Sequence, residues 1–381
     1  MPSVSCRSSE PLARRDRPFV DLRPLPAGAL PAPKAFDGAR PLTGKHPATS
    51  RPRLSIARMQ LFRHYTELPE EARHAAVAIG NFDGLHLGHQ RLIGEARDVA
   101  RRLGRPAGVL TFEPHPKRLF KPDAPAFRLT PFRTKIHVLE SLGLDVVYVL
   151  TFDRAFASLS AETFIAEALV QGLAVSHVVV GYDFCFGHQR RGNVDMLTQA
   201  GAKAGFGVSR MAPILDPSGE AYASSRIRRL LADGNPAEAA RLLGRNWEID
   251  GRVEAGAKLG RTLGFPTANF RLGETIEPRF GVYAVRGQAP SLAGERWLDG
   301  VANIGVRPMV ENVGVLAEAH FLDFSGDLYG QHLRLQLVEF IRPEAKLAGL
   351  EELKTQMHDD AARARAILGG ASAGSRAKVS S

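Results

Sequence analysis

Short apolar runs alternate with helical patterns between residues 75 and 234. Each run is too short for a helix and carries Ala, Val and Leu at successive positions, which is typical of a strand buried on both faces. The helical stretches instead repeat apolar residues every three to four positions. We expect strands over 75–79, 107–112, 146–152 and 177–182, and helices after residue 89 and over 132–142, 161–173, 194–204 and 226–232. This alternation predicts an α/β domain with a parallel sheet and helices on both faces.

The pattern changes after residue 246, where short alternating runs follow one another between Gly, Pro and Asp turns. In residues 332–337, leucine occupies every second position, so one face of that strand is apolar. Five or six such strands without intervening helices predict a small antiparallel β-barrel. The strand-like runs are 247–253, 281–286, 297–303, 318–324 and 332–340, and a terminal helix is expected over 350–368.

The two patterns predict two domains, over 59–240 and 241–368, with a hinge near 241–245. Residues 1–58 contain 10 of the 25 prolines and no sustained apolar period, which predicts a disordered extension. Acidic residues and prolines in it disfavour a transit peptide, so we expect a dispensable extension or a start codon assigned too far upstream. Residues 369–381 are expected to form a disordered tail.

Most of the net charge of +10 lies in these terminal segments. Residues 1–58 hold 11 Lys and Arg against four acidic residues, and 369–381 add two more cations, which leaves only +1 for the rest. A nearly neutral body gives no support to nucleic-acid binding. Two distant cysteines, Cys6 and Cys185, fit a reducing cytosol, and no apolar run reaches 18 residues, so we expect a cytoplasmic protein without a membrane span. The oligomeric state cannot be derived from the sequence.

Candidate chemistry begins directly after the first strand, in the ten residues GNFDGLHLGH at 80–89. A strand, a glycine loop and a helix in that order bring backbone N–H groups and the positive end of a helix dipole to one point, which favours an anion such as phosphate. His86 and His89 lie on one side of the first helical turn, where each imidazole can donate to phosphate oxygens. The residues expected to shape the cradle are Gly80, Asn81, Phe82, Asp83 and Gly84.

The histidine pair has two other interpretations. A metal half-site would need a third ligand, and none stands at a recognisable spacing nearby. Surface histidines without a role are common, but they do not explain the glycine loop. The glycines also fit neither the GxGxxG pattern of dinucleotide folds nor the GxxxxGK[ST] pattern of P-loops, so the loop is a phosphate site of another kind.

The loop resembles the HxGH signature of α/β nucleotidyltransferases. The longer string GNFDGLHLGHQ is similar to the flavin adenylyltransferase version found in prokaryotic bifunctional riboflavin kinase/FAD synthetases. The resemblance extends in order over about residues 59–368. Its further segments are TFEPHP at 111–116, GYDFCFG at 181–187, SSRIR at 224–228, LGRTLGFPTANF at 259–270 and GVYAV at 281–285.

For the first domain, the resemblance implies a Rossmann-like nucleotidyltransferase that binds ATP and FMN and forms FAD. His86 and His89 would stabilise charge on the phosphates, and Ser224, Ser225 and Arg228 would hold the triphosphate. The family more often has Thr at the position of Ser225, where a hydroxyl nevertheless remains. His115 and Asp183 are candidates for flavin or ribose contacts, with ordinary turn residues as the alternative. For Phe82, packing beneath the loop is as good an interpretation as a flavin contact.

For the second domain, the resemblance implies a riboflavin kinase. Thr267 and Asn269 would bind Mg²⁺ together with ATP, since Mg²⁺ prefers oxygen ligands. Glu318 would act as the base toward the riboflavin hydroxyl, the alternative being a solvent-facing strand residue. Met309 and Ala317 depart from the family pattern on the flavin side. The glycine-rich flap over the ATP phosphates would comprise Gly256, Lys258, Gly260, Arg261 and Thr262.

The expected function is therefore twofold: riboflavin and ATP give FMN, and FMN and ATP give FAD and pyrophosphate. A second hypothesis keeps the adenylyl transfer with another acceptor and a barrel that has lost kinase activity. A third, from a different class, is a nucleotide- or RNA-binding module, since HxGH folds with appended barrels occur in tRNA-charging enzymes. The near-neutral body and the absence of an aromatic stacking patch weigh against the third.

Overall fold

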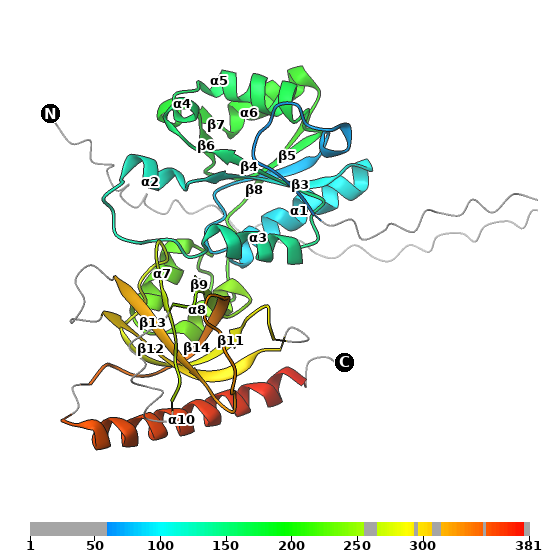
Figure 1. Ribbon diagram of the computed structural model, residues 1–381. Coiled ribbons are helices and arrows are strands. Elements are labelled where there is room, and N and C mark those ends of the chain that lie inside the picture. The colour runs from blue at the N-terminus through cyan, green and yellow to red at the C-terminus, as the bar shows by residue number, and fades with distance from the viewer. Residues whose placement is uncertain (1–58, 255–264, 293–295, 307–313, 346–347, 377–381) are drawn as a thin grey trace, which may run out of the picture. The chain divides into compact units, whose positions relative to one another are not determined.

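The computed structural model describes residues 59–254, 265–292, 296–306, 314–345 and 348–376. The expected extension (1–58), the last residues of the expected tail and the whole glycine-rich flap at 256–262 lie outside these residues. Within them, the chain forms a parallel sheet with helices, followed by a barrel and a long final helix (Figure 1). No helix in this part of the chain is long and apolar enough to cross a membrane.

A six-stranded sheet organises the first part of the chain. All neighbouring strands are parallel, in the order β1-β4-β3-β2-β5-β8, which confirms the predicted parallel sheet. The four predicted strands are present within a residue of their expected bounds, whereas the two outer strands were not predicted. The strands are β1 (Gln60–Phe62), β2 (Ala76–Ile79), β3 (Ala107–Glu113), β4 (Val146–Thr151), β5 (His177–Gly181) and β8 (Gly207–Met211).

Helices cover both faces of this sheet, as predicted. On one face Ile93 of α1 and Leu139 of α3 pack on the strands, and on the other Leu169 and Leu197 do so. The segment expected as one helix over 161–173 begins as α5 and continues with the wider turns of a π-helix. The helices are α1 (Leu87–Leu103), α2 (Pro116–Phe120), α3 (Phe132–Ser141), α4 (Arg154–Ala157), α5 (Ala161–Thr163), the π-helix Phe164–Gly172, α6 (Val194–Ala204), α7 (Ser224–Ala232) and α8 (Pro236–Leu243). A short antiparallel pair, β6 (Cys185–Phe186) and β7 (Gly192–Asn193), precedes α6.

The second sheet is antiparallel and nearly closed into a barrel, as predicted. Its order is β10-β13-β12-β11-β14-β9, and an isolated bridge between Glu254 and Asn269 joins the two edges, with the Glu254 N–H 2.7 Å from the Asn269 carbonyl oxygen. Strand β10 is not among the strand-like runs that the sequence predicted. The strands are β9 (Trp247–Arg252), β10 (Ala268–Arg271), β11 (Gly281–Gln288), β12 (Leu298–Val306), β13 (Val315–Phe321) and β14 (His332–Arg342).

The barrel buries apolar side chains in its interior and also on part of its outer surface, and helices cover both sets. Its interior core continues into α7 and α8 through side chains such as Leu231 and Leu243. The final helix, α10 (Leu350–Arg376), runs along the outside of the strands, where Ala364 and Leu368 pack against them (Figure 1). It begins where the sequence predicted and extends beyond residue 368.

Candidate functional sites

The segment 80–89, which we call the histidine loop, lies at the carboxyl end of the central strand β2 and leads into α1. Ligands of parallel sheets bind at this edge. The backbone of the loop is unusual, since Phe82, Gly84 and Leu85 all have positive φ angles, of 49°, 89° and 46°. Phe82 and Leu85 are not glycine, so their left-handed conformations must be supported by packing and by hydrogen bonds from elsewhere.

The two histidine rings stack on each other at the start of α1, with their centroids 3.7 Å apart. His86 is the N-cap of the helix, and its Nδ1 accepts a hydrogen bond from the His89 N–H at 3.2 Å. A neutral His86 therefore carries its proton on Nε2, which is a donor. Nδ1 of His89 is buried and has no hydrogen-bond partner among the described residues. Phe82 is buried and meets the His89 ring edge-on, with the ring centroids 5.3 Å apart, so it packs within the histidine loop.

Both imidazoles are neutral at physiological pH. Burial lowers the pKa of His86 to about 4, opposed by the nearby Asp83 carboxylate and assisted by the Arg245 guanidinium. Burial also lowers the pKa of His89 well below its ordinary value, and the neighbouring His86 and the Lys135 ammonium group act in the same direction. The pair can thus offer N–H donors without carrying charge, in a site where the backbone amides of the helix start supply the positive potential.

The depressed pKa of His86 predicts a loss of stability on acidification. Between pH 6.5 and about 4 the unfolded chain binds a proton that folded His86 does not, so the free energy of unfolding falls as the pH falls. For this residue alone the effect is on the order of 2–3 kcal/mol. A His86→Asn variant keeps a good N-cap without a titrating ring, and we expect it to lose less stability over this interval. Urea unfolding at pH 7 and pH 4.5 measures both slopes, and equal slopes would contradict the assignment.

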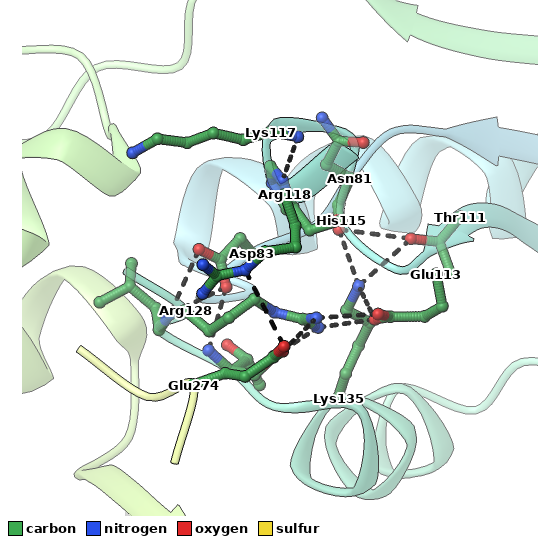
Figure 2. Close-up of polar contacts among 12 residues, drawn as sticks. Asn81, Asp83, Thr111, Glu113, His115, Lys117, Arg118, Arg128, Lys135 and Glu274 are labelled. Atoms are coloured by element: carbon green, nitrogen blue, oxygen red, sulfur yellow. Dashed lines mark hydrogen bonds and ion pairs between the residues drawn. The ribbon is translucent and has the colours of Figure 1, made fainter. Parts of the chain in front are cut away.

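Asp83 is surrounded by protein donors (Figure 2). Its carboxylate is almost fully buried and accepts the backbone N–H groups of Leu129 and Thr130, both at 3.0 Å, and a hydrogen bond from Arg228. Ser224, in the first turn of α7, donates to the Asp83 carbonyl oxygen at 2.7 Å. The expected Ser224 and Arg228 are therefore brought to the histidine loop, where both contact Asp83. Phosphate binding by Asp83 itself stays a prediction, and its contacts assign it a structural role.

Beside this carboxylate lies a buried ionic cluster that the sequence did not suggest (Figure 2). The Glu113 carboxylate accepts two hydrogen bonds from Arg128, at 2.8 and 2.6 Å, and one from Lys135 at 3.0 Å. Burial by itself would raise the pKa of Glu113, but the hydrogen bond from Arg128 and the charge of Lys135 hold the pKa below its ordinary value. Glu113 belongs to the TFEPHP segment that the sequence singled out, but Arg128 and Lys135 lie in no recognised motif.

The remaining residues expected at the first site differ in how closely they approach the buried ionic cluster. His115 caps α2 through a hydrogen bond of 3.1 Å from the Lys117 N–H. Burial lowers the pKa of His115 to about 4, opposed by the Asp83 carboxylate and assisted by the charges of Arg128, Lys135 and Arg228. Asp183 is exposed in the turn after β5, which neighbours β2, so it lies at the same sheet edge. Ser225 is exposed on α7, next to Ser224. Only His115 among these three approaches the buried cluster.

The three described residues expected for the second site come together on the barrel. Asn269 on β10 and Glu318 on β13 are directly opposite each other, and Asn303 on β12 pairs with Glu318 from the other side. The Asn269 side-chain amide donates to Thr267 Oγ1 at 3.2 Å. Ala317, next to Glu318, is fully buried in the barrel interior, so the partly buried Glu318 stands on the outer face.

A pocket of about 580 Å³, part of it open solvent, lies beside Thr267 and Asn269, and Glu318 is not among its lining residues. Its lining includes Thr267, Asn269, the aromatic rings of Phe321 and Tyr329, and the carboxylate-bearing Asp327, which sequence reasoning did not single out. Hydroxyl, amide and carboxylate oxygens in one pocket are the donor set that suits Mg²⁺. No group of three or more His, Cys, Asp or Glu side chains able to hold a metal occurs in the described ranges.

Comparison with known proteins finds a matching protein family for each of the two parts of the chain. Residues 68–226 match the FAD synthetase family and residues 243–368 match the riboflavin kinase family. A bifunctional riboflavin kinase/FMN adenylyltransferase of Escherichia coli K12 is 41% identical over 312 residues, which cover 82% of this chain and 98% of that protein. The protein of the same description from Bacillus subtilis is 38% identical over 301 residues, covering 77% and 92%.

A solved structure has the same architecture. The crystal structure of a Streptococcus pneumoniae protein described as a macrolide-efflux protein superposes with a TM-score of 0.68 at 29% identity, over 80% of this chain and 97% of that one. The match therefore extends over both the parallel sheet and the barrel.

Proposed function

Because the chain belongs to the family of bifunctional riboflavin kinase/FMN adenylyltransferases, we propose that its two reactions take place at the two sites described above. The protein phosphorylates riboflavin with ATP to give FMN, and it transfers the adenylyl group of a second ATP to FMN to give FAD. Adenylyl transfer is assigned to the histidine loop, and phosphorylation to the outer face of the barrel beside Thr267, Asn269 and Glu318. Domain boundaries at 59–240 and 241–368 accompany this assignment.

In adenylyl transfer, a phosphate oxygen of FMN attacks the α-phosphorus of ATP, and the bond to the pyrophosphate oxygen breaks. Negative charge grows on the bridging and non-bridging oxygens as this happens. His86, with its Nε2–H, and His89 would donate hydrogen bonds to those oxygens, and the amides at the start of α1 would add positive potential. The observation that carries this role is the neutral, stacked histidine pair at the carboxyl end of β2.

Arg228 would contribute from α7. Its Nε donates to the Phe127 carbonyl oxygen at 2.8 Å and its Nη2 to Asp83, so the guanidinium plane is fixed. The N–H groups on Nη1 are those it would offer to a phosphate. Ser225, exposed one residue after the Ser224 anchor, would present its hydroxyl to the same triphosphate.

On the barrel, Glu318 would accept the proton of the riboflavin 5′-hydroxyl as that oxygen attacks the γ-phosphorus of ATP and ADP leaves. Thr267 and Asn269 would hold Mg²⁺ with the nucleotide, and the flap residues 256–262 would cover its phosphates. When bound, Mg²⁺ neutralises charge on the phosphate oxygens. The support for this assignment is the juxtaposition of Thr267, Asn269 and Glu318 on one face of the barrel.

A cytoplasmic location, without nucleic-acid or membrane partners, completes the proposal. It is supported by the near-neutral charge of residues 59–368 and by the sparse cysteines. Incubation with riboflavin, ATP and Mg²⁺, followed by chromatography of the flavins, tests the whole sequence of reactions. FMN should appear first and FAD after it, and a product that stops at FMN would contradict the role given to the histidine loop.

Gly88 gives a steric test of the same loop. A Cβ at this position would lie 3.0 Å from the Tyr222 Cβ and 3.1 Å from the His86 ring, so Gly88→Ala must displace the ring. We expect FAD formation from FMN to fall by about 10- to 100-fold, because small misplacements of catalytic groups cost rate on that scale. The matched control is Gly94→Ala in the same helix, where a Cβ meets nothing within 4 Å. Steady-state rates of FAD formation are measured for both variants. Equal rates for Gly88→Ala and Gly94→Ala would refute a positional constraint on His86.

A further inference from the structure

Residues 128–135, which we call the brace, lead into the first turn of α3 and contact the histidine loop through Leu129, Thr130 and Lys135. Leu129 and Thr130 donate their backbone N–H groups to the Asp83 carboxylate. In return, the Gly84 N–H donates to Thr130 Oγ1 at 2.7 Å. The part of the loop with positive φ angles is thus hydrogen-bonded to the brace from both Asp83 and Gly84.

Lys135 makes the last of these contacts (Figure 2). Its side chain is fully buried, and Nζ donates to the Asn81 carbonyl oxygen at 3.0 Å, to Glu113 at 3.0 Å and to Thr111 Oγ1 at 3.4 Å. An ammonium group has three protons, so these partners account for its whole donor capacity. Lys135 is therefore in no position to bind a substrate phosphate, and its effect on the reaction must pass through Asn81 and the loop.

The other side of the brace is bonded to the barrel. The Arg128 N–H donates to the Glu274 carbonyl oxygen at 3.1 Å, and the Ile276 N–H donates to the Arg128 carbonyl oxygen at 2.8 Å. The indole N–H of Trp247, on the first barrel strand, donates to the Leu129 carbonyl oxygen at 2.8 Å. Leu129 therefore accepts a hydrogen bond from the barrel with its carbonyl and donates one to Asp83 with its N–H.

Disrupting the contacts between the brace and the histidine loop should cost considerable free energy. A buried ammonium is tolerated only where acceptors compensate for its lost hydration, and removing one member of a buried ionic cluster leaves the others uncompensated. The residues Phe82 and Leu85, whose φ angles are positive, flank Asp83 and Gly84, which make these hydrogen bonds. A change in the brace would therefore shift the loop, and with it the ring of His89 that packs on Phe82.

On the basis of the proposed role of the histidine loop, we infer that the brace holds this loop in its reactive geometry against the barrel, and that Lys135 and Trp247 are positioning residues for adenylyl transfer. Lys135 acts from within the first domain. Trp247 acts from the barrel, so a residue of the kinase part of the chain contributes to the reaction of the other part. Among the described residues, neither of the two lines the pocket beside Thr267 and Asn269.

The test for Lys135 uses the full chain, in which the second activity reports on folding. In Lys135→Met we expect kcat for FAD formation from added FMN and ATP to fall by about 10- to 100-fold, with KM for both substrates within about threefold. FMN formation from riboflavin should stay within about twofold of the parent rate, since the barrel site is untouched. The control, Lys203→Met, removes an exposed lysine of α6 and should change neither activity.

Other outcomes would overturn the role of Lys135. A raised KM with unchanged kcat would mean that Lys135 binds substrate. Unchanged values of both kcat and KM in a folded variant would mean that the cluster serves stability alone. Equal loss of both activities would indicate general misfolding, with no specific positioning. His86→Ala, assayed in parallel, keeps the two proposals separate: if that variant retains FAD formation, the proposed site fails whatever the result for Lys135.

The test for Trp247 uses Trp247→Phe, which keeps an aromatic ring but removes the hydrogen bond to Leu129. We expect kcat for adenylyl transfer to fall by about three- to tenfold, the effect of one hydrogen bond, while riboflavin phosphorylation continues at the parent rate. Adenylyl transfer at the parent rate would refute the contribution of the barrel. A loss of the kinase rate of the same size would refute it too, because the substitution would then act on the barrel fold.

Discussion

Replacing His86 and His89 together with Ala abolishes the conversion of added FMN to FAD, while riboflavin is still phosphorylated and FMN accumulates. We expect this result because the two rings stack at the start of α1 as neutral imidazoles, and the proposed function has them donate to the phosphates. Loss of one such donor commonly lowers kcat by about 100- to 1000-fold, so loss of both should bring FAD formation near the limit of detection. Chromatographic separation of riboflavin, FMN and FAD measures both reactions in one sample.

An exposed histidine provides the control for this experiment. His137→Ala on α3 removes an imidazole away from the loop and should leave both rates as they are. If the double variant still produces FAD at the parent rate, the histidine loop is not the site of adenylyl transfer. A simultaneous loss of FMN formation would show instead that the substitutions damage the fold beyond the loop.

The second large effect is expected at Glu318. Glu318→Gln should lower FMN formation from riboflavin by about 100- to 10,000-fold, the usual contribution of a general base, because the amide cannot accept the hydroxyl proton. Conversion of added FMN to FAD should continue at the parent rate. Spectroscopic assay of ADP release with riboflavin, and of pyrophosphate release with FMN, separates the two reactions.

A second glutamate on the barrel serves as the control for this change. Glu339→Gln removes an exposed carboxylate from β14 and alters the charge by the same amount, so it should leave the kinase rate unchanged. A Glu318→Gln variant that phosphorylates riboflavin normally would contradict the assignment of the base. Glu318 would then be an ordinary outer-face residue of β13, the alternative that the sequence left open.

Local patterns explain what could be predicted of the fold. Apolar runs and helical periods located the four inner strands of the parallel sheet, and alternation located most barrel strands. The outer strands β1 and β8 were missed because their side chains are less uniformly apolar, since one side of an edge strand has no neighbour. Strand β10 was not recognised as a separate element, because it is only four residues long and follows a segment that resembles a turn.

For the functional sites, too, local sequence patterns predicted one part and the tertiary structure decided the rest. The sequence alone predicted a phosphate-binding loop after the first apolar run. It also located two imidazoles at the start of the following helix and a resemblance to two-domain flavin enzymes, because glycine positions and motif strings are local properties. Only the tertiary structure brought Asn269 opposite Glu318, surrounded Asp83 with donors and placed Lys135 between Asn81 and Glu113. A buried charge is stable only where partners from distant segments compensate for its desolvation, and no local pattern identifies those partners.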